Sequence, residues 1–211
     1  MTKSRNCLRC LLSKLTKLTD NLCIVHYCAY AVNSHYALWA LFAMVKPMKL
    51  TLVLHNLRSC HNVGAILRTA DAVGVVRVIA VGTTPYPEIT GDTRPPHVIR
   101  NNTKLIAKTA LGAETTVTVS YEPNIKKSLS ELKNNGVTIA ALELSPDATD
   151  IFAYIAPAGP LALVLGPEVT GIPADDLALC DAVLQIPMHG TKESLNVSVA
   201  AGIALYSLMQ P

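Results

Sequence analysis

The 211-residue sequence lacks the cysteine pattern of a disulfide-stapled protein. Beyond residue 47 only two cysteines remain, Cys60 and Cys180, and they stand far apart. Small secreted proteins use closely spaced, paired cysteines, so this distribution predicts no structural disulfides and favours a reducing compartment, the cytoplasm. Internal repeats and low-complexity tracts are absent as well, and half of the residues are hydrophobic, which favours a globular domain over a disordered chain.

The sequence also lacks the glycine pattern G-x-G-x-x-G after any apolar run. That pattern lets the backbone of a dinucleotide-binding enzyme approach a pyrophosphate closely. Its absence argues against a nucleotide- or NAD-binding Rossmann enzyme.

Acidic residues are scarce in one part of the chain and basic residues in another. Residues 48–112 carry eight Lys/Arg against three Asp/Glu, whereas residues 113–211 carry four against eleven. Because residues 1–47 contribute a net charge of +5 to the total of +3, the rest of the chain is slightly acidic. Overall basicity therefore says little about nucleic-acid binding. The basic part is a candidate phosphate-facing surface, with an ordinary solvated face as the alternative; its arginines are Arg58, Arg68, Arg77, Arg94 and Arg100.

Residues 1–47 form a leader with three open interpretations. One is an upstream extension or helical appendage, because Met48 begins a clean strand pattern and would suit the start of a self-contained domain. Another is membrane association of residues 21–45, which carry no formal charge but contain interrupting histidine and asparagine side chains. The third is a zinc site, disfavoured by the lack of turn glycines, made of Cys7, Cys10, Cys23 and Cys28.

Beyond Met48, short apolar runs alternate with helical patterns. The helical patterns at 62–73 and 124–135 are each followed by a glycine, and Pro173 opens a shorter one. The apolar runs are short and bounded by turn residues, as buried parallel strands are; they span 50–54, 76–81, 115–119, 137–142, 161–165 and 182–186. The sequence therefore predicts an α/β domain over residues 48–211, with a mostly parallel sheet flanked by helices.

Chemistry-bearing residues gather in three segments that follow predicted strands, where ligands bind in parallel sheets. The first reads N-x-G-A-I-L-R-T from Asn62, and the second reads L-G-P-E-x-x-G around Gly166. Gly166 breaks a strand, and its missing side chain would let a ligand lie against the backbone. The third reads I-P-M, then S-L-N-V-S-x-A, with Ser194 as the expected helix N-cap. Taken singly, each polar residue has an ordinary interpretation as a cap or a surface side chain.

The last predicted helix is free of charge. From Ser194 to the end of the chain there is no Asp, Glu, Lys or Arg, and the helix is apolar on nearly every side. A sheet can cover only one side of a helix, so we expect a second copy of the chain to cover the rest. This predicts a homodimer through the C-terminal helix.

The three segments, in this order and spacing, resemble the motifs of the SpoU/TrmH family within the SPOUT class of RNA methyltransferases. The resemblance extends over nearly all of residues 48–211. It implies transfer of a methyl group from S-adenosylmethionine to a ribose 2′-hydroxyl in tRNA or rRNA. It also implies a C-terminal trefoil knot, which general folding rules would not predict.

The resemblance also implies the site residues, and no metal is among its cofactors. Catalytic roles are carried over to Asn62, Arg68, Glu168, Ser194 and Asn196. Cofactor contacts are carried over to Leu142, Gly166, Ile186, Met188 and Leu195. A non-catalytic RNA-binding member of the same fold is the alternative, which the intact motifs argue against.

Overall fold

The computed structural model describes residues 49–209, which form a seven-stranded, wholly parallel sheet. The strands are ordered β3-β2-β1-β6-β4-β7-β5. They are β1 (Leu50–His55), β2 (Arg77–Val81), β3 (Val119–Glu122), β4 (Thr138–Leu142), β5 (Thr149–Asp150), β6 (Leu161–Leu165) and β7 (Ala182–Gln185). The helices are α4 (Cys60–Val73), α5 (Pro96–Ala110), α6 (Ala113–Thr116), α7 (Ile125–Asn134), α8 (Ala174–Leu177) and α9 (Val197–Met209).

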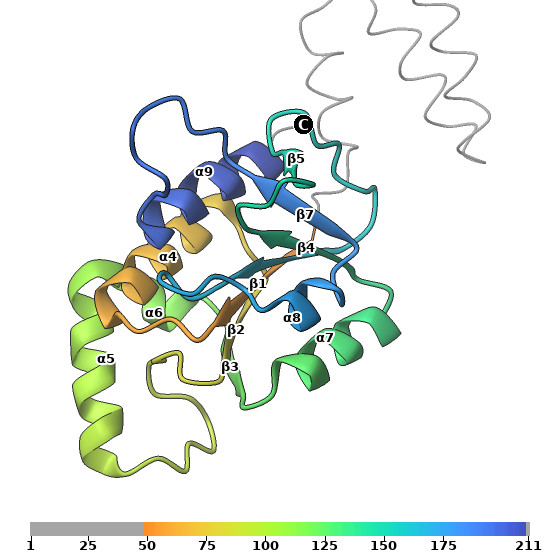
Figure 1. Ribbon diagram of the computed structural model, residues 1–211. Coiled ribbons are helices and arrows are strands. Elements are labelled where there is room, and N and C mark those ends of the chain that lie inside the picture. Colours follow the sequence, from red (N-terminus) through yellow and green to blue (C-terminus); the bar gives the residue numbers. More distant parts are fainter. Residues whose placement is uncertain (1–48, 210–211) are drawn as a thin grey trace, which may run out of the picture. The chain divides into compact units, whose positions relative to one another are not determined.

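Helices cover both faces of the sheet, giving the predicted α/β architecture (Figure 1). On one face α4, α5, α6 and α9 pack over a core in which Leu52 and Leu163 are fully buried. On the other face α7 and α8 pack over a second core, which includes Val53 and Ile139. Successive residues of a strand point to opposite faces, so Leu52 and Val53 serve different cores. Strands buried on both sides explain why the predicted runs were continuously apolar.

Most predicted elements lie where the sequence placed them, but the strand predicted at 115–119 is wrong. Residues 113–116 form the short helix α6, and the strand begins only at Val119. The β-branched threonines favour a strand, yet their hydroxyls bond back to the preceding turn: Thr115 Oγ1 donates to the Gly112 carbonyl at 2.8 Å. The helix α5 was not predicted at all.

The predictions for the leader lie outside the described residues. These are the zinc site, the membrane association of residues 21–45 and the interpretation as an appendage. Within residues 49–209, no helix has the length and apolar character needed to cross a membrane. The trefoil knot stays a prediction.

Candidate functional site

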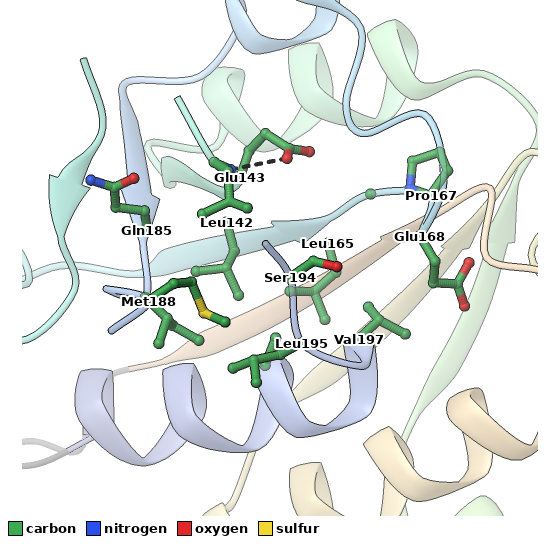
Figure 2. Close-up of a pocket in the computed structure, with 14 residues that line it drawn as sticks. Leu142, Glu143, Leu165, Pro167, Glu168, Gln185, Met188, Ser194, Leu195 and Val197 are labelled. Atoms are coloured by element: carbon green, nitrogen blue, oxygen red, sulfur yellow. Dashed lines mark hydrogen bonds between the residues drawn. The ribbon is translucent and has the colours of Figure 1, made fainter. Parts of the chain in front are cut away.

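All five residues predicted to contact a cofactor line one pocket. This pocket, called the motif pocket below, lies at the carboxyl ends of β4, β6 and β7 and against the start of α9 (Figure 2). The residues come from four separate stretches of chain and are Leu142, Gly166, Ile186, Met188 and Leu195. The parallel register explains the convergence, because β6 lies beside β4 and β4 beside β7, with their carboxyl ends at one edge.

The lining of the motif pocket is apolar with two carboxylates and no Lys or Arg. Glu168 follows β6, and Glu143 follows β4. Glu143 is fixed by two backbone donors, because its oxygens accept from the Ile172 N–H at 2.8 Å and the Leu144 N–H at 3.0 Å. Glu143 was not among the predicted site residues, although an acid directly after a predicted strand end was a usable signal. The charge of the pocket suits a ligand with a positive group.

Three predicted catalytic residues form a hydrogen-bonded chain beside the motif pocket. Asn62 Nδ2 donates to Glu168 Oε1 at 3.0 Å, and Asn196 Nδ2 donates to Asn62 Oδ1 at 3.3 Å. These contacts join residues 106 and 134 positions apart, so each of the three motifs supplies one member. Asn62 is free to act this way because Ser59, not Asn62, caps α4, with Ser59 Oγ accepting from the Asn62 N–H at 3.2 Å.

Ser194 lines the motif pocket, but it does not cap the last helix as predicted. The helix α9 begins at Val197, and the capping residue is Asn196, whose Oδ1 accepts from the Ser198 N–H at 2.9 Å. Asn196 therefore joins the hydrogen-bonded chain through Nδ2 and caps the start of α9 through Oδ1. Serine and asparagine are both favoured at helix N-caps, so the sequence alone could not decide whether Ser194 or Asn196 caps α9.

Arg68 is the one predicted catalytic residue that the structure does not bring to the others. It lies in the middle of α4, six positions after Asn62, and its side chain is exposed. It makes no hydrogen bond or ion pair with any residue in the range 49–209, and it does not line the motif pocket. No residue in this range therefore occupies its guanidinium.

The role of Gly166 differs from the predicted one. A Cβ at this position would lie closer than 3.0 Å to Ile172 Cγ1, so the missing side chain makes room for the returning loop rather than for a ligand. Gly166 still lines the motif pocket through its backbone. The packing of Ile172, which is buried, holds the loop that carries Glu168 against the strand end.

Arg94, expected on a phosphate-facing surface, is instead used inside the protein. Its guanidinium donates to the Asp92 carboxylate at 2.6 Å and to the carbonyls of Tyr86 and Pro87, each at 3.0 Å. It also stacks on the Tyr86 ring, with its central carbon 3.4 Å from the ring centroid. Most of its donors are therefore occupied, and Arg94 fixes the loop between β2 and α5.

This ion pair predicts a pH-dependent stability. Hydrogen bonds from Arg94 hold the pKa of Asp92 at about 2, below its ordinary 3.8. A depressed pKa stabilises the fold fully above about pH 4, and the stabilisation disappears as pH falls toward 2. In urea unfolding, we expect Asp92→Asn to be less stable than the wild type at pH 7, with the difference shrinking between pH 4 and pH 2. The exposed Asp147 has no such partner, so Asp147→Asn should follow the wild type; equal behaviour of both variants would contradict the assignment.

Comparison with known proteins agrees with this geometry. A model of the SpoU rRNA methylase family matches residues 49–206. A tRNA (guanosine(18)-2′-O)-methyltransferase of Thermus thermophilus is 35% identical over 157 residues, covering 74% of this chain and 72% of that protein.

Solved structures show the same fold. The A. aeolicus TrmH/SpoU tRNA modifying enzyme superposes with a TM-score of 0.62 and 29% identity, covering 82% of this chain and 80% of that one. An AdoMet-bound rRNA methyltransferase from Sinorhizobium meliloti has a TM-score of 0.62 at 23% identity, covering 77% of this chain and 56% of that one. The matched range contains all three motifs and every lining residue of the motif pocket, and so the chain belongs to the SpoU rRNA methylase family.

Proposed function

We propose that this protein is a cytoplasmic enzyme that transfers a methyl group from S-adenosylmethionine to a ribose 2′-hydroxyl in tRNA or rRNA. One observation carries the proposal: three motifs far apart in sequence supply one pocket and the hydrogen-bonded chain beside it. Family membership supports it, as does the tRNA 2′-O-methyltransferase activity of the Thermus thermophilus relative. The hydrogen-bonded chain is exposed, so a substrate as large as an RNA can reach it.

The lining of the motif pocket suits S-adenosylmethionine. Its apolar walls, including Leu165 and Val197, suit the flat face of an adenine. The carboxylates of Glu143 and Glu168 suit a ligand that carries sulfonium and ammonium charges. The residues that would hold it are Leu142, Gly166, Ile186, Met188 and Leu195. When bound, this cofactor supplies an electrophilic methyl group.

The residues beside the motif pocket would position the ribose and stabilise the charge that develops on it. Asn62 is held by Glu168 on one side and Asn196 on the other, which fixes the orientation of its amide. Together with Ser194, these groups would position the ribose, where a displacement of about 1 Å can reduce the rate a hundredfold. Arg68 would bind the adjacent phosphate and stabilise the negative charge that develops on the 2′-oxygen. A guanidinium stays protonated near neutral pH, so removal of the hydroxyl proton by Arg68 is the second candidate role.

A binding and activity assay tests the proposed function. We expect calorimetry to show one S-adenosylmethionine site per chain. Incubation with isotopically labelled cofactor and unmodified tRNA or rRNA should yield labelled 2′-O-methylnucleosides in the nuclease digest. Labelled bases instead of riboses would contradict the proposal. Binding of RNA without binding of the cofactor would favour the non-catalytic alternative.

We also propose that the protein is a homodimer through α9. The helix is buried on one side, but Val199 and Tyr206 remain 50% and 55% exposed. They lie seven positions apart and therefore on the same face of the helix. Ser207 Oγ of α9 donates to the Ile151 carbonyl at 3.3 Å, and the residue that follows Ile151, Phe152, is also an exposed apolar side chain. Such a patch is typical of a surface that another chain covers.

Light scattering tests the dimer. We expect the wild type to have twice the mass of one chain at micromolar concentration. Tyr206→Asp, which buries a charge in the proposed interface, should shift the mass toward one chain. Tyr121→Asp places the same change on an exposed tyrosine of β3 and should leave the mass unchanged. A wild type with the mass of a single chain would rule the interface out.

A further inference from the structure

A second hollow lies at the same edge of the sheet as the motif pocket. It is called the tyrosine hollow below, and it is lined by residues that include Arg58, Gly82, Thr83, Tyr86, Asn102 and Tyr121. These residues follow β1, follow β2 or belong to β3 and α5. The loop between β2 and α5, drawn in yellow in Figure 1, forms part of its wall.

The start of α4 separates the two pockets. Cys60, the first residue of α4, lines the tyrosine hollow. Asn62, two positions later, donates to Glu168 of the motif pocket. A ligand in the tyrosine hollow is thus about one helical turn away from the hydrogen-bonded chain, which we propose to position the reacting ribose.

The charge of the two pockets is opposite. The motif pocket has two carboxylates and no cation, whereas the tyrosine hollow has two arginines and no carboxylate among its lining residues. Asp92 neutralises Arg94, so Arg58 is the lining arginine that has no carboxylate partner among residues 49–209. Arg58 is exposed and forms no ion pair within the described part of the chain. The tyrosine hollow therefore suits an anion, such as a phosphate.

The aromatic wall of the tyrosine hollow is held in place before any ligand binds. The rings of Tyr86 and Tyr121 stack with centroids 4.6 Å apart and an angle of 20° between them. Arg94 occupies one face of the Tyr86 ring, so Tyr121 must lie on the other face. The Tyr121 hydroxyl donates to the Gly82 carbonyl at 3.0 Å, and its side of the stack is still 38% exposed. A fixed, exposed ring loses little entropy when a base stacks on it.

The loop after β2, which carries Tyr86, is fixed as well. Asn56 adopts a positive φ of 53° directly after β1, and its Oδ1 accepts from the Thr83 N–H at 2.9 Å. Thr84 Oγ1 donates to the Leu54 carbonyl at 2.7 Å and accepts from the Leu57 N–H at 3.0 Å. These bonds connect the loop after β2 to the end of β1. Since the walls are preformed, the hollow is a built site and not a gap between mobile loops.

We propose that the tyrosine hollow binds one nucleotide of the substrate RNA, next to the nucleotide that is methylated. Its base stacks on Tyr121, and its phosphate contacts Arg58. This inference rests on the proposed function, because the proposed function places the target ribose at the hydrogen-bonded chain beside the tyrosine hollow. It explains why the aromatic stack, the free arginine and the catalytic chain lie along one edge of the sheet.

Binding of two labelled oligonucleotides tests the base contact. The probes are a uridine 15-mer and its abasic counterpart, which keeps the phosphates and lacks the bases. We expect Tyr121→Leu to weaken binding of the uridine 15-mer about tenfold and to leave binding of the abasic probe unchanged. Tyr121→Phe keeps the ring and should bind like the wild type. Thermal unfolding of all variants checks that they are folded.

Salt dependence tests the phosphate contact. Arg58→Gln should weaken binding of both probes and reduce the slope of log affinity against log salt by about 0.7, the value for one phosphate on a single strand. Arg100→Gln, which removes an exposed charge from α5 outside the hollow, serves as the matched control. Equal losses for both arginine variants would overturn the inference, as would equal losses of Tyr121→Leu on both probes or no binding by the wild type at low salt.

The same variants separate this inference from the proposed function. If the wild type methylates RNA and both Tyr121→Leu and Arg58→Gln do so with an unchanged KM, the proposed function stands and the nucleotide site is wrong. If no ribose is methylated but binding depends on Tyr121 and Arg58 as described, the nucleotide site stands and the proposed function is wrong. S-adenosylmethionine affinity, measured by calorimetry, should be the same in all variants.

Discussion

Replacement of Arg68 by alanine should reduce the single-turnover rate of ribose methylation by about a hundredfold or more. The physical reason is the loss of a preorganised donor that stabilises charge developing in the transition state. Affinity for S-adenosylmethionine should hardly change, because Arg68 does not line the motif pocket. The measurement requires rates at saturating RNA together with a cofactor titration for each variant.

Arg100→Ala is the control for this experiment, because it removes a second exposed arginine from a neighbouring helix. It should weaken RNA binding less than Arg58→Gln does and leave the rate at saturating RNA nearly intact. If added RNA restores the rate of Arg68→Ala in the same way, then Arg68 only contributes to the basic surface. Arg94 is unsuitable as a control, because its guanidinium is used to fix the loop between β2 and α5.

The sequence predicted the pocket better than the interactions within it. Five residues assigned by resemblance line the motif pocket together, because their motifs end neighbouring parallel strands. The bond between Asn62 and Asn196 could not be foreseen, because it depends on how α4 and α9 approach each other. Neither could the different place of Arg68, which shares a motif with Asn62 but lies on another side of the same helix. Sequence motifs predict which residues belong to a site, but not which of them touch.

The fold was predictable wherever local preference and burial agreed. Strands such as Leu161–Leu165 are both apolar and buried on two sides, so the pattern was clear. The prediction failed at 115–119, where threonine hydroxyls stabilise a helical turn that the β-branched pattern argues against. It also missed α5, in which only Ile106 and Ala110 are buried. The apolar residues Val98, Ile99, Leu105 and Ile106 recur there at helical spacing, so the sequence did carry a usable signal for this helix.

The largest effect on stability is expected for Gly64→Ala. Gly64 lies in the first motif, where α4 packs against α5. A Cβ at this position would lie closer than 3.0 Å to the Ile106 carbonyl oxygen and to Thr109 Oγ1. The carbonyl belongs to a helix backbone and Thr109 is bonded to the His61 carbonyl at 2.8 Å, so neither can move cheaply. Overpacking against backbone costs about 3 kcal/mol or more, which should lower Tm by about 10 °C.

Gly202→Ala makes the same change in α9, but it should raise the stability of the protein instead of lowering it. Among residues 49–209 of one copy of the chain, its Cβ would meet only Thr69 Cγ2, at an ordinary contact distance of 4.0 Å. Alanine in a helix interior is more stable than glycine by about 1 kcal/mol, so Tm should rise by about 3 °C. Calorimetric melting of the two variants beside the wild type measures both shifts. If Gly64→Ala melted at or above the wild-type temperature, α4 and α5 would have to lie further apart than the structure places them, and the start of α4, which carries Asn62 and borders both pockets, would have to be placed anew.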